Sequence, residues 1–224
     1  MAEFPSQARV VIIGGGVGGC SIAFHLAELG WKDVVLLEKH ELTAGSTWHS
    51  AGLVGQLRSD ANLTRMMSYS TDLYRRLKEE TGQDTGWREV GGIRLASSIE
   101  RMEDLKRLVG MARSFGVPIE MISPKEALDM FPLMNIDGVL GAAFTPNDGM
   151  IDPTGLTMAL AKGAKMRGVI FYEDTEVTAI SLDQGHVNEV VTNKGSIKTM
   201  FTAIAPGWEA EEKTRAMFPW ISIN

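Results

Sequence analysis

The pattern of apolar and polar residues at the N-terminal end of the chain predicts a strand, a helix and a second strand. Residues 9–13 are an apolar run rich in β-branched residues, which is typical of a strand. Another apolar run, residues 34–37, predicts a second strand. The apolar positions between the two runs fall on one helical stripe: Val17, Cys20, Phe24 and Ala27.

A glycine-rich turn joins the first predicted strand to the helix. Gly14, Gly16 and Gly19 occupy the three positions of a GxGxxG motif, which provides a tight turn, close approach to a pyrophosphate and close helix packing. The helix N-terminus adds N–H groups and a positive dipole end that favour phosphate. The predicted phosphate-binding residues are Gly14, Gly15, Gly16, Val17, Gly18 and Gly19.

Glu38 and Lys39 directly follow the second predicted strand. A carboxylate about 20 residues beyond the glycine turn accepts hydrogen bonds from ribose hydroxyls in dinucleotide-binding units. Glu38 would also repel a 2′-phosphate, because both groups are negatively charged. The N-terminal part therefore predicts a site for a dinucleotide that has no 2′-phosphate.

Further along the chain, strands and helices no longer alternate. Helical stripes over residues 63–77 and 102–112 end near glycines, and the second is expected to start with a capping box formed by Ser97 and Glu100. Ser123 and Asp152 are predicted to cap two more helices. The remaining expected strands are residues 87–96 and 169–172. We therefore expect an inserted part between the nucleotide-binding segments.

Composition narrows the class of protein. The chain has 224 residues, 44% of them hydrophobic, and a net charge of -6, so it can bury a sizeable core and has no basic footprint for nucleic acid. Its single cysteine, Cys20, excludes an intrachain disulfide and favours a buried apolar role. No apolar run approaches the ~20 residues of a membrane span. Residues 1–9 are too short and polar for a secretory signal, so we expect a cytoplasmic protein if the source is bacterial.

Residues 43–53 are unusual for a plain NAD-binding domain, because small and hydroxylated residues precede Trp48 and His49. With this segment the chain resembles the flavin-dependent amine oxidoreductases of the D-amino-acid-oxidase superfamily, and within it the sarcosine and dimethylglycine dehydrogenases. The resemblance runs from about Ala8 to about Thr199. The motifs that carry it are Val11-Ile12-Ile13-Gly14-Gly15-Gly16, Leu36-Leu37-Glu38-Lys39, Leu42-Thr43-Ala44-Gly45-Ser46-Thr47-Trp48-His49, Ala51-Gly52-Leu53, Thr81-Gly82, Thr85-Gly86-Trp87, Asp148-Gly149 and Asp152-Pro153.

The resemblance implies FAD, joined through the family's histidine, here His49, to its 8α-methyl carbon. That attachment needs a neutral imidazole nitrogen as nucleophile. Val177 would add backbone contacts to the adenine. No acid or base is assigned, and Arg58, Arg65 and Arg94 are not assigned to the site. The residues expected to line the flavin and pyrophosphate are Gly45, Ser46, Thr47, Trp48, His49, Ser50, Ala51, Gly52 and Leu53.

The activity implied by the resemblance is oxidative demethylation of sarcosine or dimethylglycine, which oxidises a CH–NH group. Its partners would be a small N-methyl amino acid and an electron-transfer flavoprotein, with tetrahydrofolate only in full-length members and the mitochondrial matrix as location if the source is eukaryotic. Two alternatives stay open: a noncovalent FAD or NAD oxidoreductase acting on another substrate class, and a truncated, non-catalytic fragment.

The expected fold is α/β, with a Rossmann-like FAD-binding domain over residues 8–58 and 145–199 and an inserted, incomplete α+β substrate-side domain over residues 59–144. Residues 200–224 depart from the family pattern, which has an Asn-Cys-Ala-Gly or Asn-Ala-Ala-Gly turn here. Codons exist for residues 203–208 that spell Asn-Cys-Ala-Gly-Met in a shifted frame. We therefore hypothesise a frameshift after about Thr199.

Overall fold

The computed structural model describes residues 4–205 and residue 207. The chain divides into two compact units. Unit 1 contains the described residues of 1–51, 77–85 and 152–224, and unit 2 contains residues 52–76 and 86–151. The prediction differs in its boundaries, since residues 77–85 belong with unit 1 in the structure and residues 52–58 and 145–151 belong with unit 2.

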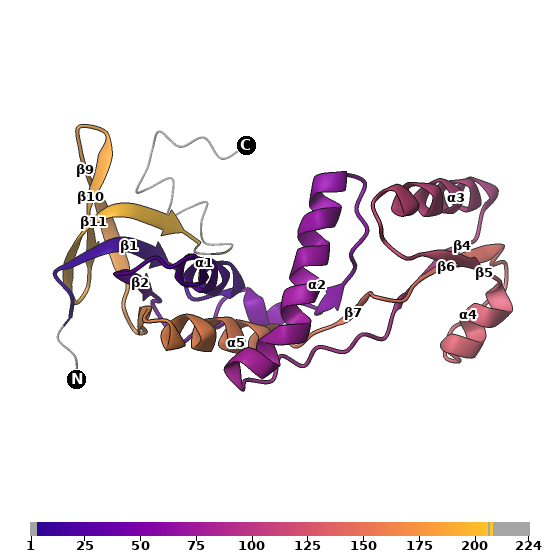
Figure 1. Cartoon of the computed structure of the whole chain (residues 1–224), viewed down its shortest axis with the longest axis horizontal. Helices are drawn as coiled ribbons and strands as arrows, with labels where there is room; N and C mark the ends of the chain where they lie inside the picture. Colours follow the sequence, from indigo (N-terminus) through magenta and orange to yellow (C-terminus); the bar gives the residue numbers. More distant parts are fainter. Residues whose placement is uncertain (1–3, 206, 208–224) are drawn as a thin grey trace. The chain divides into compact units, whose positions relative to one another are not determined.

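A six-stranded sheet forms the centre of unit 1 (Figure 1). β1, β2, β8 and β11 are parallel, and β9 and β10 extend the sheet in antiparallel fashion from β11. The strands in sheet order are β8 (Ile170–Tyr172), β2 (Val34–Leu37), β1 (Gln7–Ile13), β11 (Gly195–Ile204), β10 (His186–Thr192) and β9 (Val177–Asp183). The parallel part with its glycine turn confirms the expected α/β class.

The two central strands β1 and β2 are buried on both faces over residues 10–12 and 34–37, which explains their continuous apolar sequences. On one face, Val11, Val35 and Leu37 join Val190 and other residues of the antiparallel strands in a buried cluster. On the other face, Ile12 lies against the N-terminal turn of α1 (Val17–Glu28), at Gly19. The sheet is therefore a core layer that fixes the end of β1, where the glycine turn begins.

Helices α1 and α5 (Pro153–Met166) lie side by side in unit 1 (Figure 1). Their approach is close, because a Cβ on Gly163 would lie 2.7 Å from the Phe24 ring. The Asp152 carboxylate caps α5 by accepting hydrogen bonds from the N–H groups of Thr154 and Gly155. Gly168 follows the helix with a φ of +100°, so both predicted ends of this helix are confirmed.

Unit 2 contains a three-stranded antiparallel sheet in the order β4-β6-β5 and a two-stranded one, β3-β7. Ala96 and Ala143 pack with α3, whereas Ala142 packs with α4, so the two helices cover opposite faces of the larger sheet. The elements are β3 (Leu53–Val54), β4 (Gly92–Ala96), α3 (Ile99–Ser114), β5 (Glu120–Ile122), α4 (Pro124–Met130), β6 (Gly141–Thr145) and β7 (Gly149–Met150). Helix α2 (Ala61–Thr81) begins in unit 2, and its last turn belongs to unit 1.

Two local predictions for unit 2 are wrong. The cap of α3 is Ser98 and not Ser97, because the Ser98 side chain reaches the N–H group of Arg101 in the first turn. Of the strands expected within residues 87–96 around Gly91-Gly92, only Gly92–Ala96 forms, and the residues before Gly91 contribute an isolated bridge from Arg88 to Met150. Gly91 has a φ of +79°, a conformation that turns the backbone out of an extended strand.

The beginning of the segment predicted to diverge is part of the sheet of unit 1. Residues Phe201–Ile204 pair in parallel with β1, and the Ala205 N–H donates to the carbonyl of Ile13. Any apolar, β-prone sequence can form this backbone ladder. The frameshift hypothesis therefore stays a prediction, and its residues from 208 onward lie outside the described part of the chain.

Candidate functional site

The glycine turn after β1 is shaped by steric constraints at its two ends. Gly14 has a φ of +108°, and its N–H donates to the Leu37 carbonyl at 2.8 Å, which holds the turn on the neighbouring strand. A Cβ on Gly19 would lie 1.9 Å from the Gly14 carbonyl oxygen. These two positions therefore require glycine, one for its backbone conformation and one for the approach of α1 to the strand.

The middle of the turn is also close to other segments. A Cβ on Gly15 would lie 2.6 Å from Leu42 and 2.9 Å from Glu38. A Cβ on Gly16 would lie 3.0 Å from the Thr47 hydroxyl, while one on Gly18 would have Ala205 as its nearest neighbour at 4.0 Å. The turn thus forms a narrow backbone cradle at the start of α1, and Gly18 is the position with most space.

Glu38 lies where the sequence predicted a ribose-binding carboxylate. Its Oε2 accepts a hydrogen bond from the Gly15 N–H at 2.6 Å, and its Oε1 accepts one from the His40 N–H at 2.9 Å. A carboxylate has about four lone-pair sites, so both oxygens can accept further bonds from hydroxyls. The two backbone donors fix the carboxylate beside the glycine turn at the end of β2.

The histidine segment, residues 45–53, contacts the start of α1 through Thr47. The segment contains the short 3-10 helix η1 (Thr47–His49), whose first residue is buried. The Thr47 hydroxyl accepts a hydrogen bond from the Val17 N–H at 3.0 Å. Since Gly16 has no side chain to cap α1, Thr47 provides the acceptor that the helix N-terminus needs.

Trp48 and His49 follow Thr47 and are exposed. Their rings face each other with centroids 3.7 Å apart and an interplanar angle of 32°. The imidazole is therefore reachable by a ligand that enters beside the N-terminus of α1. Gly45 leaves open space around its backbone, because a Cβ there would meet nothing within 4 Å.

The other predicted residues divide between the two units. Val177 is buried at the start of β9, and two residues earlier the Thr175 N–H donates to the Glu38 carbonyl at 2.7 Å. This contact brings the start of β9 to the end of β2, and the contact of Val177 with adenine stays a prediction. Gly52 and Leu53 belong to unit 2, where the Gly52 carbonyl accepts from the Ile151 N–H and Leu53 pairs with Met150.

Cys20 has the buried apolar role that the sequence predicts, and His25 makes its ring contact within α1. Cys20 is fully buried, and burial raises its thiol pKa to about 12, which keeps the group neutral and unreactive. The His25 ring contacts the Ser21 carbonyl within α1 at 2.7 Å. Over the described residues, neither a three-residue metal cluster of His, Cys, Asp or Glu nor a helix long and apolar enough to cross a bilayer is present.

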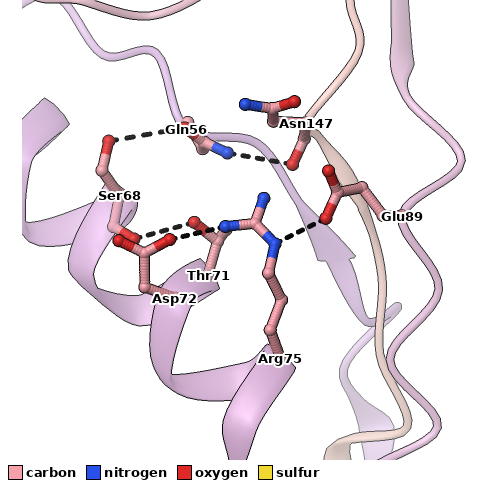
Figure 2. Close-up of polar contacts among 7 residues, drawn as sticks. All are labelled: Gln56, Ser68, Thr71, Asp72, Arg75, Glu89 and Asn147. Atoms are coloured by element: carbon pink, nitrogen blue, oxygen red, sulfur yellow. Dashed lines mark hydrogen bonds and ion pairs between the residues drawn. The ribbon is translucent and has the colours of Figure 1, made fainter.

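Sequence reasoning missed the polar network that fixes the continuation of the histidine segment in unit 2. The buried Gln56 donates its backbone N–H to Asp148 Oδ1 at 2.8 Å and its side-chain amide to the Asn147 carbonyl at 2.9 Å. Figure 2 shows this amide between Asn147 and Ser68, whose hydroxyl donates to Gln56 Oε1. Such contacts between distant segments leave no periodic signal in a sequence.

A second part of the same network joins α2 to the segment before β4. In Figure 2, Arg75 reaches Glu89 with Nε at 2.6 Å and Asp72 with Nη1 at 2.5 Å. Burial raises the pKa of Asp148. The hydrogen bond from Gln56 and the positive charges of Arg94 and Arg58 act in the opposite direction and lower it. The only sequence signal for these residues was the family motif Asp148-Gly149.

Comparisons with known proteins agree with this geometry. The family model described as FAD dependent oxidoreductase (DAO) matches residues 9–221. The L-proline dehydrogenase of P. horikoshii is similar in structure, with a TM-score of 0.91, 33% identity, and coverage of 98% of this chain and 58% of that one.

Three curated relatives are similar in sequence. Dimethylglycine dehydrogenase of Rattus norvegicus is 42% identical over 94% of this chain, and sarcosine dehydrogenase of Homo sapiens is 43% identical over 87%. The pyruvate dehydrogenase phosphatase regulatory subunit of Mus musculus is 39% identical over 93%. All three are named as mitochondrial, and the matches cover 24%, 22% and 24% of their respective lengths.

The chain thus spans about a quarter of the length of these relatives. The family model nevertheless covers nearly all of it, including the glycine turn, the carboxylate after β2 and the histidine segment. The chain belongs to the family of FAD dependent oxidoreductases.

Proposed function

We propose that this chain is the FAD-binding part of an enzyme that oxidises the N-methyl group of dimethylglycine or sarcosine, with FAD attached to His49. The observation that carries the proposal is the Thr47–Val17 hydrogen bond, which places the exposed His49 beside the N-terminus of α1. The similarity to dimethylglycine and sarcosine dehydrogenases supports the substrate class.

The residues present fit FAD. Gly15 and Gly16 leave a backbone cradle that a Cβ would fill, and α1 starts without a side-chain cap from its own N-cap residue. Phosphate oxygens would accept hydrogen bonds from the N–H groups of this first helical turn other than that of Val17, which donates to Thr47. Glu38 would hold the ribose hydroxyls, and the start of β9 at Val177 would border the adenine.

When bound, FAD supplies the acceptor for a hydride from the N-methyl carbon. His49 would hold the cofactor as a covalent anchor on the isoalloxazine side, while the residues from Gly45 to Leu53 border it. We further propose that an electron-transfer flavoprotein takes up the electrons and that tetrahydrofolate acts only with longer members of the family. No described residue is assigned as catalytic acid or base.

Acid precipitation tests the anchor directly. The chain is expressed with FAD, freed of unbound flavin, and its visible spectrum is recorded before and after precipitation. Wild-type protein should keep its yellow colour in the pellet, whereas His49→Ala should release all flavin into the supernatant. His40→Ala is the matched control, because His40 is exposed and near Glu38 but outside the histidine segment. A His49→Ala pellet as yellow as the wild type would contradict the attachment.

A second candidate function is a flavin-binding module without turnover. It is favoured by the 39% identity to a protein named as a regulatory subunit. The two candidates differ in an anaerobic titration of the yellow protein with dimethylglycine or sarcosine. Bleaching of the flavin band supports the dehydrogenase, and an unchanged band with flavin retained supports the module.

A further inference from the structure

A groove in unit 2 combines apolar walls with clustered arginines. It has a volume of about 410 Å³, within the ~300–1,000 Å³ range typical of small-molecule sites. Leu57, Leu105 and Leu108 form part of its apolar lining, and the first two also belong to the buried core beneath α3. The groove therefore has a fixed apolar base in this unit.

Arg58 and Arg94 both line this groove, and their guanidinium groups approach each other beside Gly55. Arg58 Nη1 lies 3.6 Å and Arg94 Nη2 3.8 Å from the point where a Cβ on Gly55 would stand, and Asp148 Oδ2 lies 3.4 Å from it. Both side chains are half-buried. Glycine at position 55 is thus what lets two guanidinium groups and one carboxylate share this space.

A third arginine lines the groove from α3 and is only partly neutralised. Arg101 Nη1 lies 3.7 Å from Asp104, and the same carboxylate is also paired with Arg107. The Asp148 carboxylate likewise interacts with both Arg58 and Arg94. Among the described residues that line the groove, three are therefore arginines and one, Asp104, is a carboxylate, in a chain whose net charge is -6.

We propose that this groove binds a small carboxylate that carries a short aliphatic chain. Guanidinium groups bind carboxylates through paired, charge-assisted hydrogen bonds, and a partly desolvated cluster with excess positive charge favours an anion. The leucine side chains would cover the aliphatic part. Arg94 is the ligand to test first, because the Arg58 guanidinium already donates to the Leu57 carbonyl at 3.2 Å, Arg101 is paired with Asp104, and Arg94 shares its neighbouring carboxylate, Asp148, with Arg58.

Calorimetric titration of the full chain with hexanoate tests the proposal, with hexanamide and hexylammonium as neutral and cationic counterparts of the same shape. Hexanoate should bind at least about tenfold more tightly than hexanamide, and its affinity should fall as salt is added. Equal affinity for the three compounds, or no heat with hexanoate, would overturn the proposal. This result needs no substitution, so it stands even where a variant does not fold.

Variants then test whether the positive charge that binds the carboxylate is that of Arg94. Arg94→Met should weaken hexanoate binding about tenfold, and Arg94→Lys should restore most of it. Arg113→Met is the matched control, because Arg113 is exposed on α3 and does not line the groove. Unchanged binding in Arg94→Met would remove Arg94 from the site. Because neither flavin content nor turnover is measured, failure here leaves the proposed function untouched, and the reverse also holds.

Discussion

The sharpest consequence of the glycine turn is that two neighbouring glycines should respond in opposite ways to the same added methyl group. In Gly19→Ala the new Cβ would lie 1.9 Å from the Gly14 carbonyl oxygen, whereas in Gly18→Ala it would lie 4.0 Å from its nearest neighbour, Ala205. Both residues lie in the first turn of α1, so the helical context is shared.

The magnitudes follow from these distances. Carbon and oxygen atoms stand at least 3.0 Å apart in real Cβ contacts, so α1 must move about 1 Å from β1 in Gly19→Ala. Overpacking of this kind costs about 1–3 kcal/mol or more. Gly18→Ala should instead stabilise the helix by about 0.5–1 kcal/mol, because alanine loses less backbone entropy than glycine.

Urea unfolding followed by circular dichroism measures both effects. With a slope of about 2–3 kcal/mol per molar urea for a chain of this size, Gly19→Ala should lower the midpoint by roughly 0.5 M or more, and Gly18→Ala should raise it slightly. Equal midpoints for the two variants would refute the packing described here. A fall in both would show that the turn needs glycine for a reason other than this contact.

Three further predictions concern the polar contacts. Thr47→Val should destabilise the chain by about 1 kcal/mol and speed amide hydrogen exchange at Val17, while Thr47→Ser should not, since it keeps the acceptor at 3.0 Å; equal exchange in both would argue against the cap. Burial raises the pKa of Asp148 above its ordinary value of 3.8, so its contribution to stability is present at lower pH and is lost as pH rises through the folded-state pKa. Thermal unfolding of Asp148→Asn should therefore show a smaller loss of stability than the wild type as pH rises above 3.8, and parallel pH profiles would contradict this. Arg75→Met should cost about 1 kcal/mol or less in urea unfolding, because the Arg75 side chain is 34% exposed at its pairs with Asp72 and Glu89; a larger loss would mean that the network in Figure 2 is more cooperative than its contacts suggest. For the frameshift hypothesis, sequencing of the gene is decisive, since a codon set for residues 203–208 without the Asn-Cys-Ala-Gly-Met reading would end it.

Local signals in the sequence were sufficient for most of the fold. The glycine spacing, the apolar runs of β1 and β2 and the helix caps at Ser123 and Asp152 each depend on residues within a few positions of one another. The ends of α2 and α3 were also predictable, because glycines follow both helices with positive φ, at Gly82 and Gly116. The cap at Ser98 was misplaced by one residue, since two adjacent serines offer the same hydroxyl.

The remaining features depend on contacts between distant residues. Nothing local to Thr47 indicates that its hydroxyl caps a helix that begins 30 residues earlier. The hydrogen bond from Gln56 to Asp148 joins residues 92 positions apart. The last turn of α2 belongs to unit 1, and nothing in the composition of the helix indicates this. The boundary between the units was therefore predicted too simply, as one inserted segment, whereas the structure has two, residues 52–76 and 86–151.

These contacts separate the roles of the residues around the cradle. Gly14 and Gly19 are constrained by the backbone, and Thr47 by its bond to Val17, so changes at these positions should alter folding and cofactor content together. His49 is exposed, and its ring contact is the neighbouring Trp48, so its removal should alter flavin retention without altering the unfolding midpoint. A His49→Ala chain that loses both would mean that the imidazole supports the local fold, and covalent attachment would then need evidence other than loss of colour.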